Sequence, residues 1–200
     1  MSFIGATMAV MMTFMQGVDE TGTAVARPIG SVQTDSATGS KYQIFEFYGR
    51  PPHTWEHARR MVKGYIIDGR EGQLATVKDV TTHYFLILNF PEMRNLPMWI
   101  GLYAQCNETA ELFWADDTPL ADQAFRGFAD GVARKISRSC TGRNKNSGNT
   151  APIYYQPDEF GVRWQMGSSK QNLQYMMVEF PKPKEEAEAG EGETGETQQP

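Results

Sequence analysis

The stretch Met98-Trp99-Ile100-Gly101-Leu102-Tyr103 is a strongly apolar run in the middle of the chain. Its length and its large apolar side chains are typical of a buried strand. The glycine inside it indicates that another backbone segment passes close by, because a side chain at that position would keep the two apart. The sequence therefore predicts a central, tightly packed strand over residues 98–103.

Two helices and a short strand are expected before this run. Apolar residues at 55, 58, 61 and 62 form one face of an amphipathic helix, and Thr54 stands at its N-cap after a Pro-Pro pair. A short buried strand covers 72–77. A second helical pattern runs from Val80 to Leu88, with Tyr84, Phe85 and Leu88 on one side.

Short strands are expected after the run. One covers 112–114 and leads into a turn at Asp116-Asp117, and three more cover 152–155, 162–165 and 174–180. Residues 156–161 form the hairpin turn between the first two of these three. Early helices followed by many short strands are typical of an α+β fold.

The ends of the chain differ from its middle. Residues 185–200 carry six glutamates and no basic residue, so the net charge of −5 becomes +1 for the rest. We expect three parts: an apolar N-terminal segment with a polar linker (1–40, the linker over 31–40), one domain over 41–181, and an acidic disordered tail over 182–200.

Residues 2–17 are uncharged, rich in methionine and too short for a membrane span, which needs about 20 residues. Two interpretations stay open. A retained segment must be buried against the domain or against an assembly subunit. Alternatively, it is a signal peptide cleaved after Ala26, although it lacks a basic residue before the apolar run.

The chain has only two cysteines, Cys106 and Cys140. Two cysteines allow at most one internal bridge, which excludes a disulfide-framed secreted scaffold. The favoured interpretation is two free thiols in a reducing compartment, with pairing of the two as the alternative.

Several short motifs follow one another in an order known from one family. They are TWEHA (54–58), GQLATV (72–77), WIGL (99–102), FWADD with TPL (113–120), RW (163–164) and YMMVEF (175–180). This order resembles the C-type lectin fold, from Lys41 to Phe180. The resemblance implies two helices, small antiparallel sheets and a long variable loop region that carries the binding surface.

The chain departs from that family in two ways. The family's long-range disulfide would fall at Val62 and Val178, where packing must replace it, and its second disulfide is also missing. Calcium needs six to eight oxygen ligands, but Trp164 is followed by Gln165-Met166, where sugar-binding relatives supply an Asn-Asp pair. The triplet 156–158 and the pair Asp116-Asp117 are interpreted as turn residues. We therefore expect no metal and no other cofactor.

The segment 126–150 is the candidate binding site. It contains six basic residues against one aspartate, a local charge of +5, and few core-forming residues. It is expected to bind an acidic glycan or protein surface, with a merely solvated loop as the alternative. Sequence-specific nucleic-acid binding is not expected, because no aromatic residue interleaves with the basic ones. The candidate ligand-binding residues are Arg126, Arg134, Lys135, Arg138, Arg143 and Lys145.

No catalytic motif is present in the sequence. His53, His57 and His83 make no metal-binding spacing with the cysteines, and surface roles are expected for them. The sequence thus predicts a non-enzymatic, calcium-independent recognition module. The alternative is a structural protein of a virion or appendage, assembled in the cytoplasm and anchored through residues 2–17. The expected location is a virion or cell surface after cytoplasmic assembly, or outside the cell if the signal peptide is used.

Overall fold

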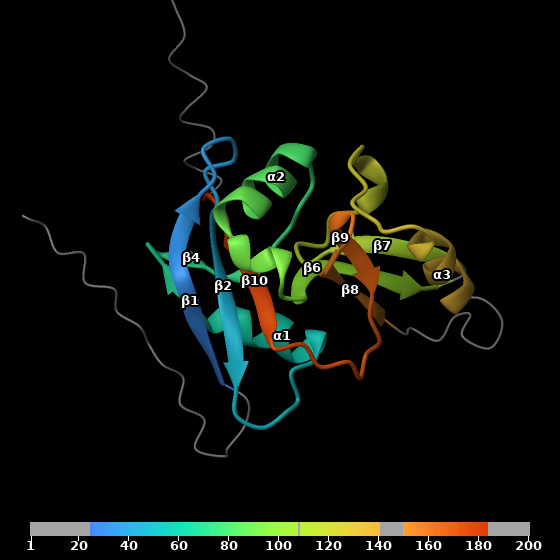
Figure 1. Cartoon of the computed structure of the whole chain (residues 1–200), viewed down its shortest axis with the longest axis horizontal. Helices are drawn as coiled ribbons and strands as arrows, with labels where there is room; N and C mark the ends of the chain where they lie inside the picture. Colours follow the sequence, from blue (N-terminus) through green and yellow to red (C-terminus); the bar gives the residue numbers. More distant parts are fainter. Residues whose placement is uncertain (1–24, 108, 141–149, 184–200) are drawn as a thin grey trace, which may run out of the picture.

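The apolar run forms β6 (Met98–Cys106) at the centre of an eight-stranded mixed sheet (Figure 1). The computed structural model describes residues 25–107, 109–140 and 150–183. The main path of the sheet runs β1-β2-β10-β6-β8-β9, with β5 beside β10 and β7 beside β6. Only the β10–β6 pair is parallel. The other strands are β1 (Val25–Thr34), β2 (Lys41–Tyr48), β5 (Gln73–Leu74), β7 (Ala110–Trp114), β8 (Thr150–Asp158), β9 (Gly161–Met166) and β10 (Tyr175–Phe180).

The close packing predicted at Gly101 is confirmed. A Cβ at this position would lie 2.5 Å from the carbonyl oxygen of Leu74 and 3.1 Å from that of Ala75. No side chain fits at those distances, and the Gly101 amide donates instead to Ala75 O at 2.9 Å. The glycine therefore lets the segment after β5 lie directly against the central strand.

The two ends of the predicted domain lie side by side. Strands β2 and β10 pair antiparallel, with Lys41 opposite Phe180 and Glu46 opposite Tyr175. Strand β1 then adds an edge outside β2. The expected linker over 31–40 is therefore wrong in its first four residues, which belong to β1. The sequence assigns these four residues to a linker because they are mostly polar. An edge strand can be polar, because its partner strand supplies the hydrogen bonds and few of its side chains need to be buried.

The first helix is confirmed with its cap. Helix α1 (Trp55–Met61) begins after Thr54, whose hydroxyl oxygen accepts from the His57 amide at 3.4 Å. Trp55 donates from Nε1 to the Ile100 carbonyl oxygen at 2.7 Å, which fastens the helix to β6. A 3-10 turn, η1 (Val62–Gly64), and the small hairpin of β3 (Ile66–Ile67) and β4 (Arg70–Glu71) follow it.

The second helix is confirmed as α2 (Val80–Asn89), which Asp79 caps through a bond from the Thr82 amide at 2.8 Å. Its buried residues are Thr82 and Leu86. The 3-10 turn η2 (Pro91–Arg94) continues from it, and η3 (Leu120–Asp122) follows β7. Helix α2 thus turns only a narrow face toward the core.

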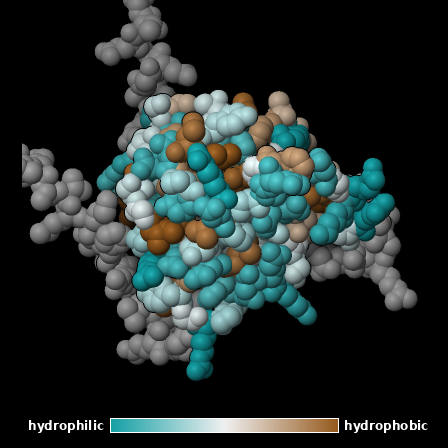
Figure 2. Space-filling view, in the orientation of Figure 1, coloured by the Kyte–Doolittle hydropathy of each residue, from teal (hydrophilic) through white to brown (hydrophobic). Residues whose placement is uncertain are grey.

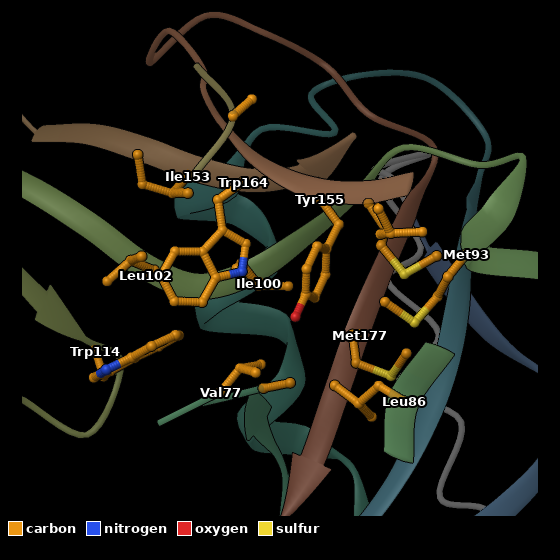
Figure 3. Packing of buried hydrophobic residues seen from close by; sticks show 14 of the residues in the cluster. Val77, Leu86, Met93, Ile100, Leu102, Trp114, Ile153, Tyr155, Trp164 and Met177 are labelled. Atoms are coloured by element: carbon orange, nitrogen blue, oxygen red, sulfur yellow. The ribbon is translucent and has the colours of Figure 1, made fainter. Parts of the chain in front are cut away.

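Two clusters of buried side chains fill the space between the sheet and the helices. All four tryptophans are less than 2% exposed and are core residues. Trp114 and Trp164 belong to the cluster shown in Figure 3. Val62 and Val178 both belong to the other cluster. Apolar packing therefore joins the end of α1 to the last strand, where the related fold has a disulfide.

This arrangement is the α+β, C-type-lectin-like fold that the sequence predicted, with two corrections. The described residues form three α-helices instead of two, because α3 (Val132–Ser139) lies inside the expected long loop. The strands also join into one large mixed sheet and one small hairpin, instead of several small sheets. The register of β10 against both β2 and β6 produces this union.

Candidate functional site

Part of the predicted basic loop forms the helix α3, which has one buried face and one exposed face. Val132, Ile136 and Cys140 are spaced four residues apart and are buried at 3%, 2% and 2% exposure. The helix begins at Gly131, whose φ of +77° is readily available only to glycine. The expectation of a loop without core periodicity is therefore wrong for these residues.

The outer face of α3 carries three of the six predicted site residues. Arg134, Lys135 and Arg138 are all exposed and lie within one turn of one another. Helix α3 contains no acidic residue. Figure 2 shows hydrophilic residues at the end of the molecule where α3 lies. We call these three side chains the basic face.

The remaining predicted residues are not part of this face. The Arg126 guanidinium bonds to carbonyl oxygens of its own loop, those of Gln123, Phe125 and, at 3.5 Å, Ala121. That contact stabilises the turn before α3. Arg143 and Lys145 lie outside the described residues.

A disulfide holds the end of α3 against the sheet. Cys106, the last residue of β6, is bonded to Cys140, the C-cap of α3, with a Cα–Cα distance of 4.9 Å. The interpretation of the two cysteines as free thiols is therefore wrong. Sequence alone could not favour pairing, because the two positions are 34 residues apart and meet only when α3 packs beside the sheet.

Trp164 supports the chain just before α3. Its ring packs edge-on against Trp114, Phe125 and Phe128, with ring centroids 5.1–5.5 Å apart. Its backbone amide donates to Gly127 O at 2.7 Å, and its carbonyl oxygen accepts from the Ala129 amide at 3.0 Å. The segment that leads into α3 is thus bonded to β9 along its backbone. The basic face consequently rests on a rigid support at both ends.

The carboxylates near this end of the molecule have local partners. Asp158 accepts two bonds from Arg163, at 2.7 and 3.1 Å, and one from the Phe160 amide at 2.8 Å. These hydrogen bonds hold the pKa of Asp158 below its usual value. The hairpin predicted at 156–161 is confirmed, but its turn is shorter than expected and lies at Asp158–Gly161. Gln156 and Pro157, expected in the turn, instead belong to β8, where they pair with Arg163 and Val162.

Asp116 and Asp117 occupy the predicted turn after β7. Asp116 pairs with Lys78 and accepts from the amide and hydroxyl of Thr118. Burial acts to raise the pKa of Asp116, but the bonds from Lys78 and Thr118 outweigh it, so the pKa is lowered. Among the residues that the structure describes, no group of three or more His, Cys, Asp or Glu side chains could hold a metal ion.

The histidines occupy half-buried positions instead of the expected surface. His83 Nδ1 lies 2.8 Å from the Tyr155 hydroxyl, and burial lowers the pKa of its imidazole. The His53 ring stacks on Phe47, and its pKa is lowered by burial and then by the neighbouring His57.

A pocket of about 510 Å³ opens beside His53, far from α3 in the sequence. Two segments more than 100 residues apart form it, so no local pattern could have revealed it. Its residues are Phe47, Tyr48, Gly49, His53, Asn172, Leu173 and Gln174. The Asn172 side chain is already engaged, since it accepts from the His53 amide at 2.7 Å and donates to Lys170 O at 3.3 Å.

No helix in the described ranges has both the length and the apolar character needed to cross a bilayer.

Two solved structures are similar to the chain at low sequence identity. Rhodocetin is 16% identical, with 78% of this chain and 99% of that chain covered, at a TM-score of 0.44. EMS16, an antagonist of the collagen receptor integrin α2β1, is 12% identical, with 76% and 97% covered, at a TM-score of 0.45. No family model and no curated protein matches the sequence. These identities are too low to carry a ligand or a partner over to this chain.

Proposed function

We propose that this protein is a non-enzymatic, calcium-independent recognition module that binds an acidic surface, of a glycan or a protein, through the basic face of α3. The observation that carries the proposal is the exposure of Arg134, Lys135 and Arg138 together on one short helix.

Electrostatics explains what the basic face can do. Clustered positive charge raises the rate of encounter with an acidic partner, and complementary charge fixes its orientation. Arginine guanidinium groups can bind carboxylate, sulfate or phosphate groups through two parallel hydrogen bonds. Because the Cys106–Cys140 bridge and the Trp164 cluster already hold α3, little conformational entropy is lost on binding.

Calcium has no role in this proposal. Asp116 and Asp158 are committed to Lys78 and Arg163, respectively, so neither carboxylate is free to start a calcium site. The proposal assigns no catalytic role to the histidines. His83 contacts the Tyr155 hydroxyl, and the His53 ring stacks on Phe47.

The test compares the parent with Arg134→Gln/Lys135→Gln/Arg138→Gln on immobilised heparin and on immobilised polyglutamate. Glutamine keeps the helix propensity of the replaced residues. The matched control, Arg60→Gln/Lys63→Gln/Lys170→Gln, removes three exposed charges elsewhere. We expect the basic-face variant to lose binding and the control to keep it.

The two surfaces distinguish the kinds of partner. Retention on heparin alone indicates a sulfated glycan, and retention on polyglutamate alone indicates an acidic protein face. Equal retention of the parent and the basic-face variant on both surfaces would refute the proposal.

A further inference from the structure

Helix α2 exposes an apolar stripe that no described residue covers. Val80, Tyr84 and Leu88 follow one another at intervals of four residues and are 48%, 60% and 70% exposed. The half-buried Ile87 continues the stripe. Figure 2 shows hydrophobic residues over the part of the surface that α2 occupies in Figure 1. We call this surface the α2 stripe.

The composition of α2 is unusual for a helix at the surface. Its ten residues, VTTHYFLILN, include no Asp, Glu, Lys or Arg. A helix with solvent on one side normally carries charged residues there. An outer face that is apolar and uncharged indicates a surface that another apolar element covers.

The size of the α2 stripe decides between a second copy and a smaller occupant. A standard protein–protein interface needs about 800 Å² from each partner. Three partly exposed side chains supply only a few hundred Å², roughly the size of a single apolar patch. One short helical segment fits this area, whereas a dimer would require further apolar surface around it.

The N-terminal segment of the same chain has the matching pattern. Residues 2–17 contain no charged residue, and Ile4, Met8, Met11 and Met15 recur at intervals of four, three and four. This spacing is typical of one face of a helix. Methionine side chains adapt to an irregular apolar surface better than branched ones do.

The chain length allows this segment to reach α2. The residue that follows β1 contacts α2, since the Thr82 hydroxyl donates to Asp35 at 3.4 Å. Strand β1 itself passes beside η2, the turn that continues α2, since a Cβ at Gly30 would lie 3.9 Å from Glu92 Oε1. Gly30 is five residues after the start of β1, or about 17 Å along the strand. The seven residues 18–24 can span about 24 Å, which covers that distance.

We propose that residues 2–17 dock as a helix on the α2 stripe of their own chain, through Ile4, Met8, Met11 and Met15. The proposal is independent of the basic face, which lies on a different helix. Docking removes two apolar surfaces from water at once. It also makes the N-terminal segment part of the folded domain.

Photo-crosslinking of the full chain tests this contact. p-Benzoylphenylalanine replaces Tyr84, and in a control it replaces Phe160, which is 72% exposed in the β8–β9 hairpin. Chains with and without ¹⁵N are mixed, irradiated and analysed as peptides by mass spectrometry. We expect crosslinks from position 84 to residues 2–17 of the same isotopic chain, and none from position 160.

Three results would overturn the proposal. They are a mature chain that lacks residues 2–17, a label from position 84 that goes elsewhere or to the other isotopic chain, and equal labelling of residues 2–17 from both positions. Each can be read from the same spectra.

Two double variants test which face of residues 2–17 contacts the α2 stripe. Met8→Glu/Met11→Glu should lower the crosslink yield about tenfold, since burying two carboxylates among apolar side chains is costly. Ala6→Glu/Thr13→Glu adds the same charge on the opposite side of a helix and should keep the yield of the parent. Equal yields from the two variants would show that the methionine face is not the contact.

Discussion

Cys106 and Cys140 join the last residue of the central strand to the C-cap of α3. The bridge closes a loop of the chain between residues 106 and 140. This loop contains β7, the aromatic residues that pack on Trp164, and the basic face. The bridge therefore ties the α-helix with the highest net charge in the described chain to the largely buried central strand. Stability and presentation of the basic face are linked through this one bond.

Replacing both cysteines by serine should lower the free energy of unfolding by about 4 kcal/mol, from the unfolded-chain entropy of a loop of this length. The separation of 34 residues sets that estimate. Urea unfolding measures the effect. Reductant should destabilise the parent and leave Cys106→Ser/Cys140→Ser unchanged. A parent that reductant does not affect would contradict the bridge.

Trp164→Ala should cost about 3–5 kcal/mol, because its ring fills the space between Trp114, Phe125 and Phe128. Phe160→Ala, in the turn between β8 and β9 and largely exposed, should stay within about 0.5 kcal/mol. Thermal and urea unfolding compare the two. A Trp164→Ala protein that stays fully folded and loses only binding would show that this tryptophan belongs to the ligand site.

Chelation of calcium should leave both the melting temperature and heparin binding unchanged. The reasons are the Gln165-Met166 pair after Trp164 and the engagement of Asp158 by Arg163. A ligand that binds only the native state raises the melting temperature, so a calcium site would be visible as a drop of several degrees with EDTA. Calorimetry with and without EDTA makes the measurement.

Stability should fall in acid, partly through His83. Burial lowers the pKa of His83 in the folded protein, whereas the unfolded chain titrates near about 6.5. The unfolded state therefore binds the proton more readily. The contribution of His83 to the free energy of unfolding is complete above about pH 6.5 and is lost as the pH falls toward the lower pKa of the folded state. His83→Gln should show a smaller loss of unfolding free energy than the parent between about pH 7.5 and pH 5.5. An unchanged pH slope would exclude His83 as a source of the effect.

The salt dependence of binding should identify the basic face. Surface charges are screened over about 10 Å at 0.1 M salt, so binding by the parent should weaken steeply as salt is added. Arg134→Gln/Lys135→Gln/Arg138→Gln should show a flatter dependence, and Arg60→Gln/Lys63→Gln/Lys170→Gln should follow the parent. The same slope for all three would place the contact away from α3.

Local patterns predicted the elements that depend on neighbouring residues. The Thr54 hydroxyl caps α1 because only a residue at that position can reach the His57 amide. The hairpin between β8 and β9 turns at Asp158–Gly161, where turn-forming residues stand together. The close approach of another backbone segment at Gly101 followed from the position of this glycine inside an apolar run.

Other features needed the positions of distant residues. The end of strand β1 has a polar sequence that predicts a linker. It forms a strand because its backbone pairs with the edge of β2. Helix α2 has apolar residues on two sides, so its sequence does not show which side packs against the core. The tertiary structure shows that Leu86 is buried and that Leu88 is exposed.

The α+β class, the central strand and the basic character of the segment around α3 could all be predicted from the order of residues. Hydrophobic spacing, caps and turn residues act over a few positions, and this information is contained in the order of residues. The tertiary structure alone decided that Cys106 and Cys140 pair and that Arg134, Lys135 and Arg138 share one exposed face. These relationships depend on how α3 packs against the sheet, because burial of Val132 and Ile136 fixes which side of the helix faces the solvent.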